Sequence, residues 1–272
     1  MKIILSPVFA FLVFLLLPGN TGAAQQQDTT TPITIRIMTV VICQQDGFLQ
    51  NLLEPYLSGR NIRIEYSHGH HSEVARAVTE DRIDLAITHT KVQAMHKLEK
   101  SGHLEKGRKL FANAMAFLGP TGDPAGITGM HDPVLAVKKI QEAGHCFVIN
   151  GHDRLSKIQE KLLEQADISN SCVIRDEEIE NLSAVESAVE NNAYTLWGLH
   201  PYVRKDENKL QPVIIPHDML LEDMSGWAVS GSPVKNEVID LINYLKGSEA
   251  EKRIREFRLD KYKALQAWWP AS

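Results

Sequence analysis

The chain has 272 residues, of which 43% are hydrophobic and 23% are charged, and its formal net charge is −5. This composition is typical of a folded globular protein and excludes a wholly disordered chain. The excess of acidic residues, together with the lack of a basic stripe in the sequence, argues against nucleic acid as a partner.

The first 24 residues have the pattern of a secretory signal. Lys2 is followed by an apolar run at residues 8–17, and small residues end the segment at Ala24. The run is shorter than the roughly 20 residues that span a bilayer. We therefore expect a signal that is cleaved after Ala24 or one residue earlier, the alternative being an uncleaved membrane anchor. The expected product is periplasmic or otherwise secreted, has no stable membrane insertion and consists of residues 25–272.

Strands alternate with helices in the next part of the chain. Strands are predicted from β-branched residues or from alternating polarity, at residues 33–41, 62–66 and 83–88. Helices are predicted from apolar residues at helical spacing, at residues 48–57, 72–80 and 92–101. Ser72 is the expected cap of the second helix. This order predicts a mostly parallel sheet with helices packed on it.

A second block of strands and helices follows. Residues 114–120 predict a strand that leaves the first block. Further strands are expected at 146–149, 172–174 and 193–196, and further helices at 133–144, 155–166 and 182–191. We expect the chain to return near residues 211–215 and to close with helices at 236–245 and 249–262.

The two blocks together predict an α/β fold with two lobes. The first lobe is expected to contain residues of about 33–113 and 216–264, and the second about 114–215. Ligands of such folds bind beyond the carboxyl ends of the strands, so the sequence predicts a binding cleft between the lobes.

The chain has three cysteines, Cys43, Cys146 and Cys172, and an exported protein meets an oxidising compartment. An odd number allows at most one bridge within the chain. Cys146 and Cys172 each lie in an apolar, strand-like segment. A bridge between them and two buried thiols are both compatible with the sequence.

Several segments resemble, in the same order, the ABC-transporter tungstate-binding protein family. These are DLAITH at 84–89, FLGP at 117–120, DPAGI at 123–127 and ENNAYTL at 190–196, within a match of roughly residues 33–257. The resemblance implies a type II periplasmic-binding-protein fold whose cleft closes on a solute. We therefore expect a monomeric solute-binding protein, not an enzyme, with a small solute or ion and an ABC transporter permease as its partners.

The turns at which that family holds tungstate or molybdate differ in this chain. They are VICQ at 41–44, SHGHH at 67–71, NGHDRLS at 150–156 and GLH at 198–200. Hydroxyls, backbone N–H groups and Arg forks hold tetrahedral oxyanions, and two Arg and several hydroxyls of the family's pattern are missing. Arg154 and Ser156 substitute for them only in part. We expect tungstate and molybdate to bind at least ~100-fold more weakly than to a protein that keeps these donors.

The candidate ligand-binding residues lie at or near these turns. They are Cys43, Gln44, His70, Asn150, His152, Arg154, Ser156, Trp197 and His200. Four of them, Cys43, His70, His152 and His200, form a candidate transition-metal site, because imidazole and thiolate are ligands of Zn, Cu and Ni.

Other interpretations of the same turns stay open. His side chains and Arg154 also suit an anionic or polar solute, and a cleft that has lost binding is a further alternative. A small hydrolase or transferase with His152 as base and Asp153 as orienter is less well supported, because no nucleophile stands beside them.

Overall fold

The computed structural model describes residues 31–43, 47–168, 172–176, 178–205, 209–259 and 262–271. The chain divides into Met1–Thr31 and a second unit, Pro32–Ser272, to which the following description refers. The expected signal segment with its cleavage site, and the candidate ligand Gln44, lie outside the described residues. Of the helices in the described part of the chain, none has both the length and the apolar character needed to span a bilayer.

A ten-stranded sheet organises the unit, in the order β2-β1-β3-β9-β4-β7-β5-β6, with β8 and β12 also pairing with β4. The first sheet section contains β1 (Ile33–Val40), β2 (Ile62–Gly69), β3 (Leu85–His89), β9 (Leu221–Ala228) and the N-terminal half of β4 (Arg108–Gly119). β1 runs parallel to β2 and β3, whereas β9 runs antiparallel to β3 and β4. The predicted parallel arrangement of the first three strands is confirmed.

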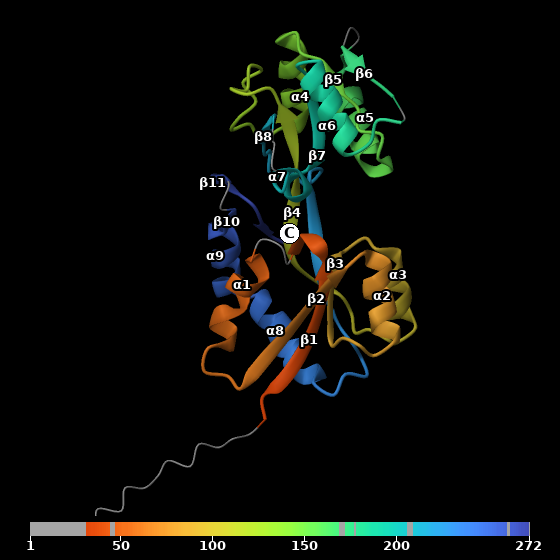
Figure 1. Cartoon of the computed structure of the whole chain (residues 1–272), viewed down its shortest axis with the longest axis vertical. Coiled ribbons are helices and arrows are strands. Elements are labelled where there is room, and N and C mark those ends of the chain that lie inside the picture. The colour runs from red at the N-terminus through yellow and green to blue at the C-terminus, as the bar shows by residue number, and fades with distance from the viewer. Residues whose placement is uncertain are drawn as a thin grey trace, which may run out of the picture. The chain divides into compact units, whose positions relative to one another are not determined.

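Helices cover both faces of the first sheet section (Figure 1). They are α1 (Phe48–Leu57), α2 (His71–Thr79), α3 (Gln93–Lys100), α8 (Lys235–Leu245) and α9 (Ser248–Glu256), and a short 3-10 helix at Val41–Cys43 follows β1. Alternation along β1 explains this arrangement, because successive side chains of a strand point to opposite faces. Ile37 enters the core that contains α1, whereas Met38 enters a separate core with Val74 of α2 and Trp227 of β9.

The second sheet section contains β5 (Phe147–Val148), β6 (Val173–Ile174), β7 (Tyr194–Gly198), β8 (Gln211–Val213) and the C-terminal half of β4. Its helices are α4 (Pro133–Glu142), α5 (Asp153–Ala166), α6 (Leu182–Glu190) and α7 (Leu199–Val203). A disulfide joins Cys146 and Cys172, which directly precede the paired strands β5 and β6. The structure thus decides between the two alternatives for these cysteines.

Strand β4 belongs to both sections of the sheet (Figure 1). Its residues up to Ala114 pair with β9, and its residues from Met115 onward pair with β7 and β8. The chain returns to the first section between β8 and β9. The expected lobe boundaries, near residues 113 and 215, fall at these two crossings, and we keep the two-lobed division as a proposal.

The C-terminal part departs from the sequence prediction at strand β9 and at the last helix. Strand β9 was not predicted; the chain pairs with the end of β4 as β8 at Gln211–Val213 and then returns to the first section. The last helix ends at Glu256 and not at residue 262, and the chain continues as β10 (Arg258–Leu259), β11 (Tyr262–Gln266) and β12 (Trp269–Pro270). β9 contains Gly226 and two acidic residues and lacks β-branched residues, so its local pattern is weak.

The start of α2 also differs from the prediction. The helix begins at His71, so Ser72 lies inside its first turn and is not the cap. The backbone N–H of His70 donates to the carboxylate of Glu73 at 2.6 Å. A carboxylate in the first turn satisfies an amide that the helix itself leaves unpaired, and this contact fixes the helix start.

Candidate functional site

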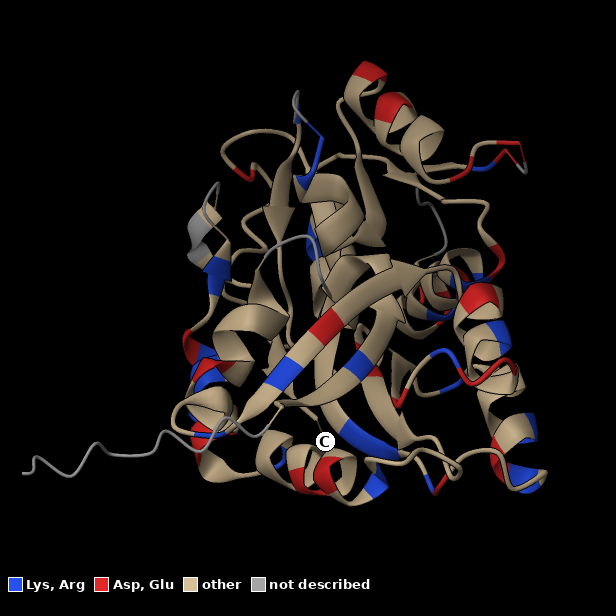
Figure 2. Cartoon of the chain, turned by 60° about the horizontal axis from the view of Figure 1, so that its bottom comes forward, with Lys and Arg blue, Asp and Glu red and all other residues tan. Residues whose placement is uncertain are grey.

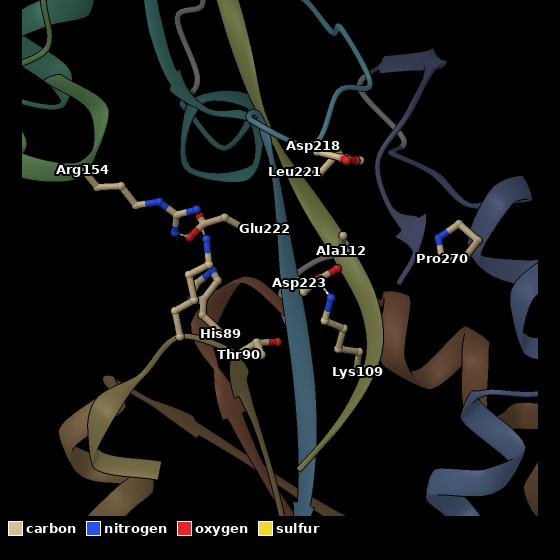
Figure 3. Close-up of a pocket in the computed structure, with 11 residues that line it drawn as sticks. His89, Thr90, Lys109, Ala112, Arg154, Asp218, Leu221, Glu222, Asp223 and Pro270 are labelled. Carbon is tan, nitrogen blue, oxygen red and sulfur yellow. Dashed lines mark ion pairs between the residues drawn. The ribbon is translucent and has the colours of Figure 1, made fainter. Parts of the chain in front are cut away.

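A cavity of about 280 Å³ lies at the carboxyl end of β3. Its wall contains His89 at the end of β3, the two residues that follow it, and Lys109 and Ala112 of β4. The start of β9, Asp218 just before it and Pro270 of β12 also line the cavity, and Arg154 reaches it from the first turn of α5. Figure 3 shows Arg154 reaching the same point as side chains of β3 and β9. The cavity therefore lies where a ligand of an open α/β sheet is expected, beyond the ends of the strands.

An ion pair between Arg154 and Glu222 forms one side of the cavity. The Glu222 side chain is 16% exposed and the Arg154 side chain 36% exposed. Burial lowers the pKa of Arg154 from its ordinary value. Because an Arg side chain keeps its charge at neutral pH all the same, the guanidinium is a partly dehydrated cation held by one carboxylate.

His89 lies beside this ion pair (Figure 3). Burial, together with the positive charges that the neighbouring His71 and Arg154 carry, lowers its pKa to about 3. The imidazole is therefore neutral at neutral pH. Its Nε2 is buried and has no hydrogen-bond partner among the described residues, the Glu222 carboxylate being 3.7 Å away. A bound solute or water is the natural partner for such an atom.

A second ion pair lies on the opposite side of the cavity. Lys109 Nζ is 2.6 Å from the carboxylate of Asp223 (Figure 3). The backbone of Asp223 accepts a hydrogen bond from Thr90 N–H at 2.8 Å, which ties the segment after β3 to β9. Both ion pairs thus use consecutive residues of β9, and alternation places their side chains on opposite faces of that strand.

Arg154 is the predicted ligand residue that lines this cavity among those the structure describes. Three of the others are buried elsewhere in the fold: Cys43, Asn150 and His200 have 0% exposure. The side-chain oxygen of Asn150 accepts backbone N–H groups from His152 and Asn181 at 3.2 and 2.9 Å. Its role in the structure is to hold loops together.

The remaining predicted residues are exposed or committed to other contacts. His70 and His152 are exposed and precede α2 and α5. Ser156 donates to the carbonyl of Asp153 at 3.1 Å, in its own helix. Trp197 is 9% exposed and packs edge-on against Tyr202, with 6.4 Å between the ring centroids.

The geometry does not assemble the expected metal site. Within the described residues no group of three or more His, Cys, Asp or Glu side chains is placed to hold a metal ion. Two of the proposed ligands, Cys43 and His200, lie in the core, where the main hydrophobic cluster includes Cys43. Asp153, the orienter of the hydrolase hypothesis, forms its ion pair with Lys157 at 2.7 Å. Neither alternative gains support from these contacts.

Sequence reasoning missed Glu222, Asp223, Lys109 and Asp218 as cavity residues. Each is an ordinary charged residue without a motif around it, and Glu222 and Asp223 lie in the strand that was not predicted. His89 stands out in the sequence only as a histidine at the end of the third predicted strand. Lys109 lies in the first part of β4, which begins at Arg108 and not at the predicted residue 114, so the sequence offered no signal for it.

The described unit has a periplasmic-binding-protein fold, and the predicted fold class is confirmed. The solved structure of the tungstate-binding protein TupA from Desulfovibrio alaskensis G20 matches with a TM-score of 0.67 and 18% identity, covering 88% of this chain and 99% of that one. The tungstate ABC transporter structure from Geobacter sulfurreducens matches with a TM-score of 0.56 and 22% identity, covering 82% and 98%. The resemblance seen in the sequence motifs is thus confirmed at the level of the fold.

Two further comparisons bear on function. A substrate-binding domain assigned to a molybdenum ABC transporter of Clostridium difficile matches with a TM-score of 0.62 and 11% identity, covering 88% of this chain and 100% of that one. A curated protein of Haloferax volcanii, named provisionally as an ABC transporter anion-binding protein, is 26% identical over 149 residues. This match spans 54% of the present chain and 42% of the relative's length. No family model matches the chain.

Proposed function

We propose that the chain is an extracytoplasmic solute-binding protein that holds a small charged solute in the cavity between Arg154 and the start of β9. The observation that carries this proposal is the cavity itself. It brings a cation from α5 against the ends of β3 and β9, in a fold shared with solute-binding proteins. A volume of about 280 Å³ is near the lower limit for ligand pockets and favours a small solute.

Transport is the context that the relatives suggest. The names of the matched proteins refer to ABC transporters or to tungstate binding. Together with the secretory pattern of residues 1–24, they support export of this chain and delivery of its solute to a membrane permease.

Calorimetry and thermal melting of the purified chain test this function. The probes are a panel of small charged solutes: oxyanions, carboxylic acids, amines and amino acids. At least one should bind and raise the melting temperature of the wild type, and the Arg154→Ala variant should lose that response. Asp153→Asn, one residue away and exposed, is the matched control and should respond as the wild type does. If no probe binds at millimolar concentration, the proposed function is wrong.

The turns that correspond to the oxyanion-holding turns of the tungstate-binding family differ in this chain, and this difference predicts a quantitative result for tungstate. A protein that keeps the family's Arg and hydroxyl donors, measured side by side, should bind tungstate and molybdate at least ~100-fold more tightly than this chain. The structure adds a reason, since Arg154 is engaged by Glu222 and Ser156 Oγ by its own helix. Nanomolar tungstate binding by this chain would contradict the proposal of a rewritten pocket.

A further inference from the structure

The cavity contains equal numbers of charged groups of each sign. Its cations are Lys91, Lys109 and Arg154, and its anions are Asp218, Glu222 and Asp223. His89 adds no charge at neutral pH, because burial lowers its pKa to about 3. A site with this balance has no net attraction for an anion or for a cation.

Glu222 already forms an ion pair with the guanidinium of Arg154, the positive group that an anionic solute would bind. The contact joins the first turn of α5 to the start of β9, and its two head groups meet at one wall of the cavity (Figure 3). Both side chains are partly shielded from water, Glu222 more than Arg154. An incoming anion therefore has to compete with a carboxylate that is part of the chain.

The cost of breaking this pair depends on what the solute offers in return. A simple anion that takes Arg154 leaves Glu222 without a partner and adjacent to a second negative charge. A simple cation that pairs with Glu222 leaves Arg154 without a partner and adjacent to a second positive charge. Removing one member of a shielded ion pair is costly, because the other charge stays dehydrated and uncompensated. A solute with both signs replaces both partners at once.

We propose that the cleft selects small zwitterionic solutes, with an acid group on Arg154 and an amine on Glu222. The inference rests on the proposed solute-binding function and names the substrate class of the same cavity. Glu222 is then a specificity-determining residue that rejects oxyanions and accepts ammonium groups. The Arg fork suits a carboxylate or a similar planar or tetrahedral acid group, since it offers parallel N–H donors.

Calorimetry with matched probes tests the proposal. The panel contains the standard amino acids, β-alanine, taurine and 2-aminoethylphosphonate, and each zwitterion that binds is compared with its analogue lacking the amine and its analogue lacking the acid. For β-alanine these are propionate and propylamine. The wild type should bind the zwitterion at least about 30-fold more tightly than either analogue, a ratio within the range that an unpaired buried charge produces.

Two substitutions separate the roles of the pair. Glu222→Gln should reduce the preference for the zwitterion over the amine-free acid at least tenfold, because Arg154 becomes available to simple anions. Arg154→Gln should lose affinity for the zwitterion and for the acid alike. Glu65→Gln, in an exposed ion pair with Arg63 on β2, is the control and should leave all affinities unchanged. Melting curves of each variant report whether it is folded.

The outcomes distinguish this inference from the proposed function. If tungstate, sulfate or a simple acid binds the wild type as tightly as any zwitterion, solute binding holds and the zwitterion inference is wrong. The zwitterion inference is also wrong if Glu222→Gln leaves the preference unchanged. If neither zwitterions nor oxyanions, acids or amines bind, the solute-binding function itself is wrong, and this inference with it.

Discussion

The imidazole of His200 is fully buried, and its Nε2 lies 3.1 Å from the carbonyl oxygen of Ala267. A carbonyl only accepts hydrogen bonds, so Nε2 carries the proton and donates. The ring also packs on Trp268, with 4.4 Å between the centroids. These contacts attach the C-terminal segment to α7 and give His200 a structural role in place of the predicted ligand role.

Replacing His200 with Ala should therefore lower stability and leave solute binding unchanged. We expect a loss of about 3 kcal/mol in the free energy of unfolding, from an unsatisfied buried carbonyl and from lost packing. Urea unfolding measures the loss, and calorimetry with the solute measures binding. A variant of wild-type stability with abolished binding would restore His200 as a ligand.

His89 makes a different prediction, about pH. Its pKa is about 3 in the folded protein and about 6.5 in an unfolded chain, so the unfolded chain binds more protons between these values. Stability rises with pH where the unfolded state binds more protons. The free energy of unfolding should thus fall by about 2 kcal/mol from pH 7.5 to pH 5, and further toward pH 3.

The His89→Gln variant isolates this contribution. Gln stays neutral throughout the range, so the variant should lose less stability than the wild type between pH 7.5 and pH 5 in urea unfolding. His71, whose pKa is lowered by burial and by His70, keeps its own contribution in both proteins. His103→Gln, at an exposed position, should keep the wild-type slope. Equal slopes for His89→Gln and wild type would show that His89 is not the titrating group.

At the scale of elements, Asp84 connects three segments of the first sheet section. It is 1% exposed and accepts hydrogen bonds from Arg36 of β1, through the backbone N–H at 2.8 Å and the guanidinium at 2.9 and 3.0 Å. Ser232, after β9, donates to it at 2.8 Å. Burial raises the pKa of Asp84, but the hydrogen bonds from Arg36 and Ser232 lower it by more.

Asp84→Ala should destabilise the fold by about 3 kcal/mol, because several donors lose a buried acceptor. The depressed pKa means that the contribution of Asp84 is present above the unfolded Asp pKa near 4 and is lost as the pH falls through the lower folded value. Urea unfolding at pH 7 checks the magnitude. Glu65→Ala, which removes an exposed ion pair with Arg63, should change stability by less than about 0.5 kcal/mol.

The disulfide between Cys146 and Cys172 predicts a second effect at this scale. It closes a loop with a sequence separation of 26 that contains β5 and α5, and it ends directly before β6. Chain-entropy arguments give about 3.5 kcal/mol for a loop of this size. Reduction should lower the melting temperature, and a Cys146→Ala/Cys172→Ala variant should melt low with or without reductant. A wild type whose melting temperature is insensitive to full reduction would contradict this estimate.

At the scale of the whole unit, the sheet is continuous from β2 to β6 through β4. The core follows the same path, since one hydrophobic cluster contains Phe48 of α1, Phe117 of β4 and Phe147 of β5. In the view of Figure 2, acidic and basic residues are interspersed along the helices, strands and loops. The continuous sheet and the shared core couple the two sheet sections mechanically.

Calorimetric unfolding should accordingly show one cooperative transition for the described unit. A solute bound in the cavity touches both sections through Arg154 and β9, so it should stabilise the entire transition. At a hundredfold excess over its dissociation constant it should contribute about 2.7 kcal/mol. Two resolved transitions, of which only one responds to the solute, would show that the sections unfold independently.

The sequence by itself determined the alternation of strands and helices up to β7, whereas the short helix α7 (Leu199–Val203) was not predicted. β1 and α1 were recognisable because their patterns repeat within a few residues, and α1 has the expected bounds, Phe48–Leu57. The motif resemblance also pointed to the correct fold. Local periodicity is enough for these features, since neighbouring residues decide whether a segment can bury one face.

Tertiary structure decided which charged residues meet. Arg154 was a predicted ligand, but its contact with Glu222 depends on the tertiary arrangement that brings the first turn of α5 near the start of β9, two elements far apart in the chain. Likewise, His200 becomes a core residue only because Trp268 and Ala267 return to cover it. The local sequence pattern around Arg154 or His200 does not indicate whether the side chain faces a cavity or lies in the core. The burial and partners that distinguish these cases arise only when distant segments pack together.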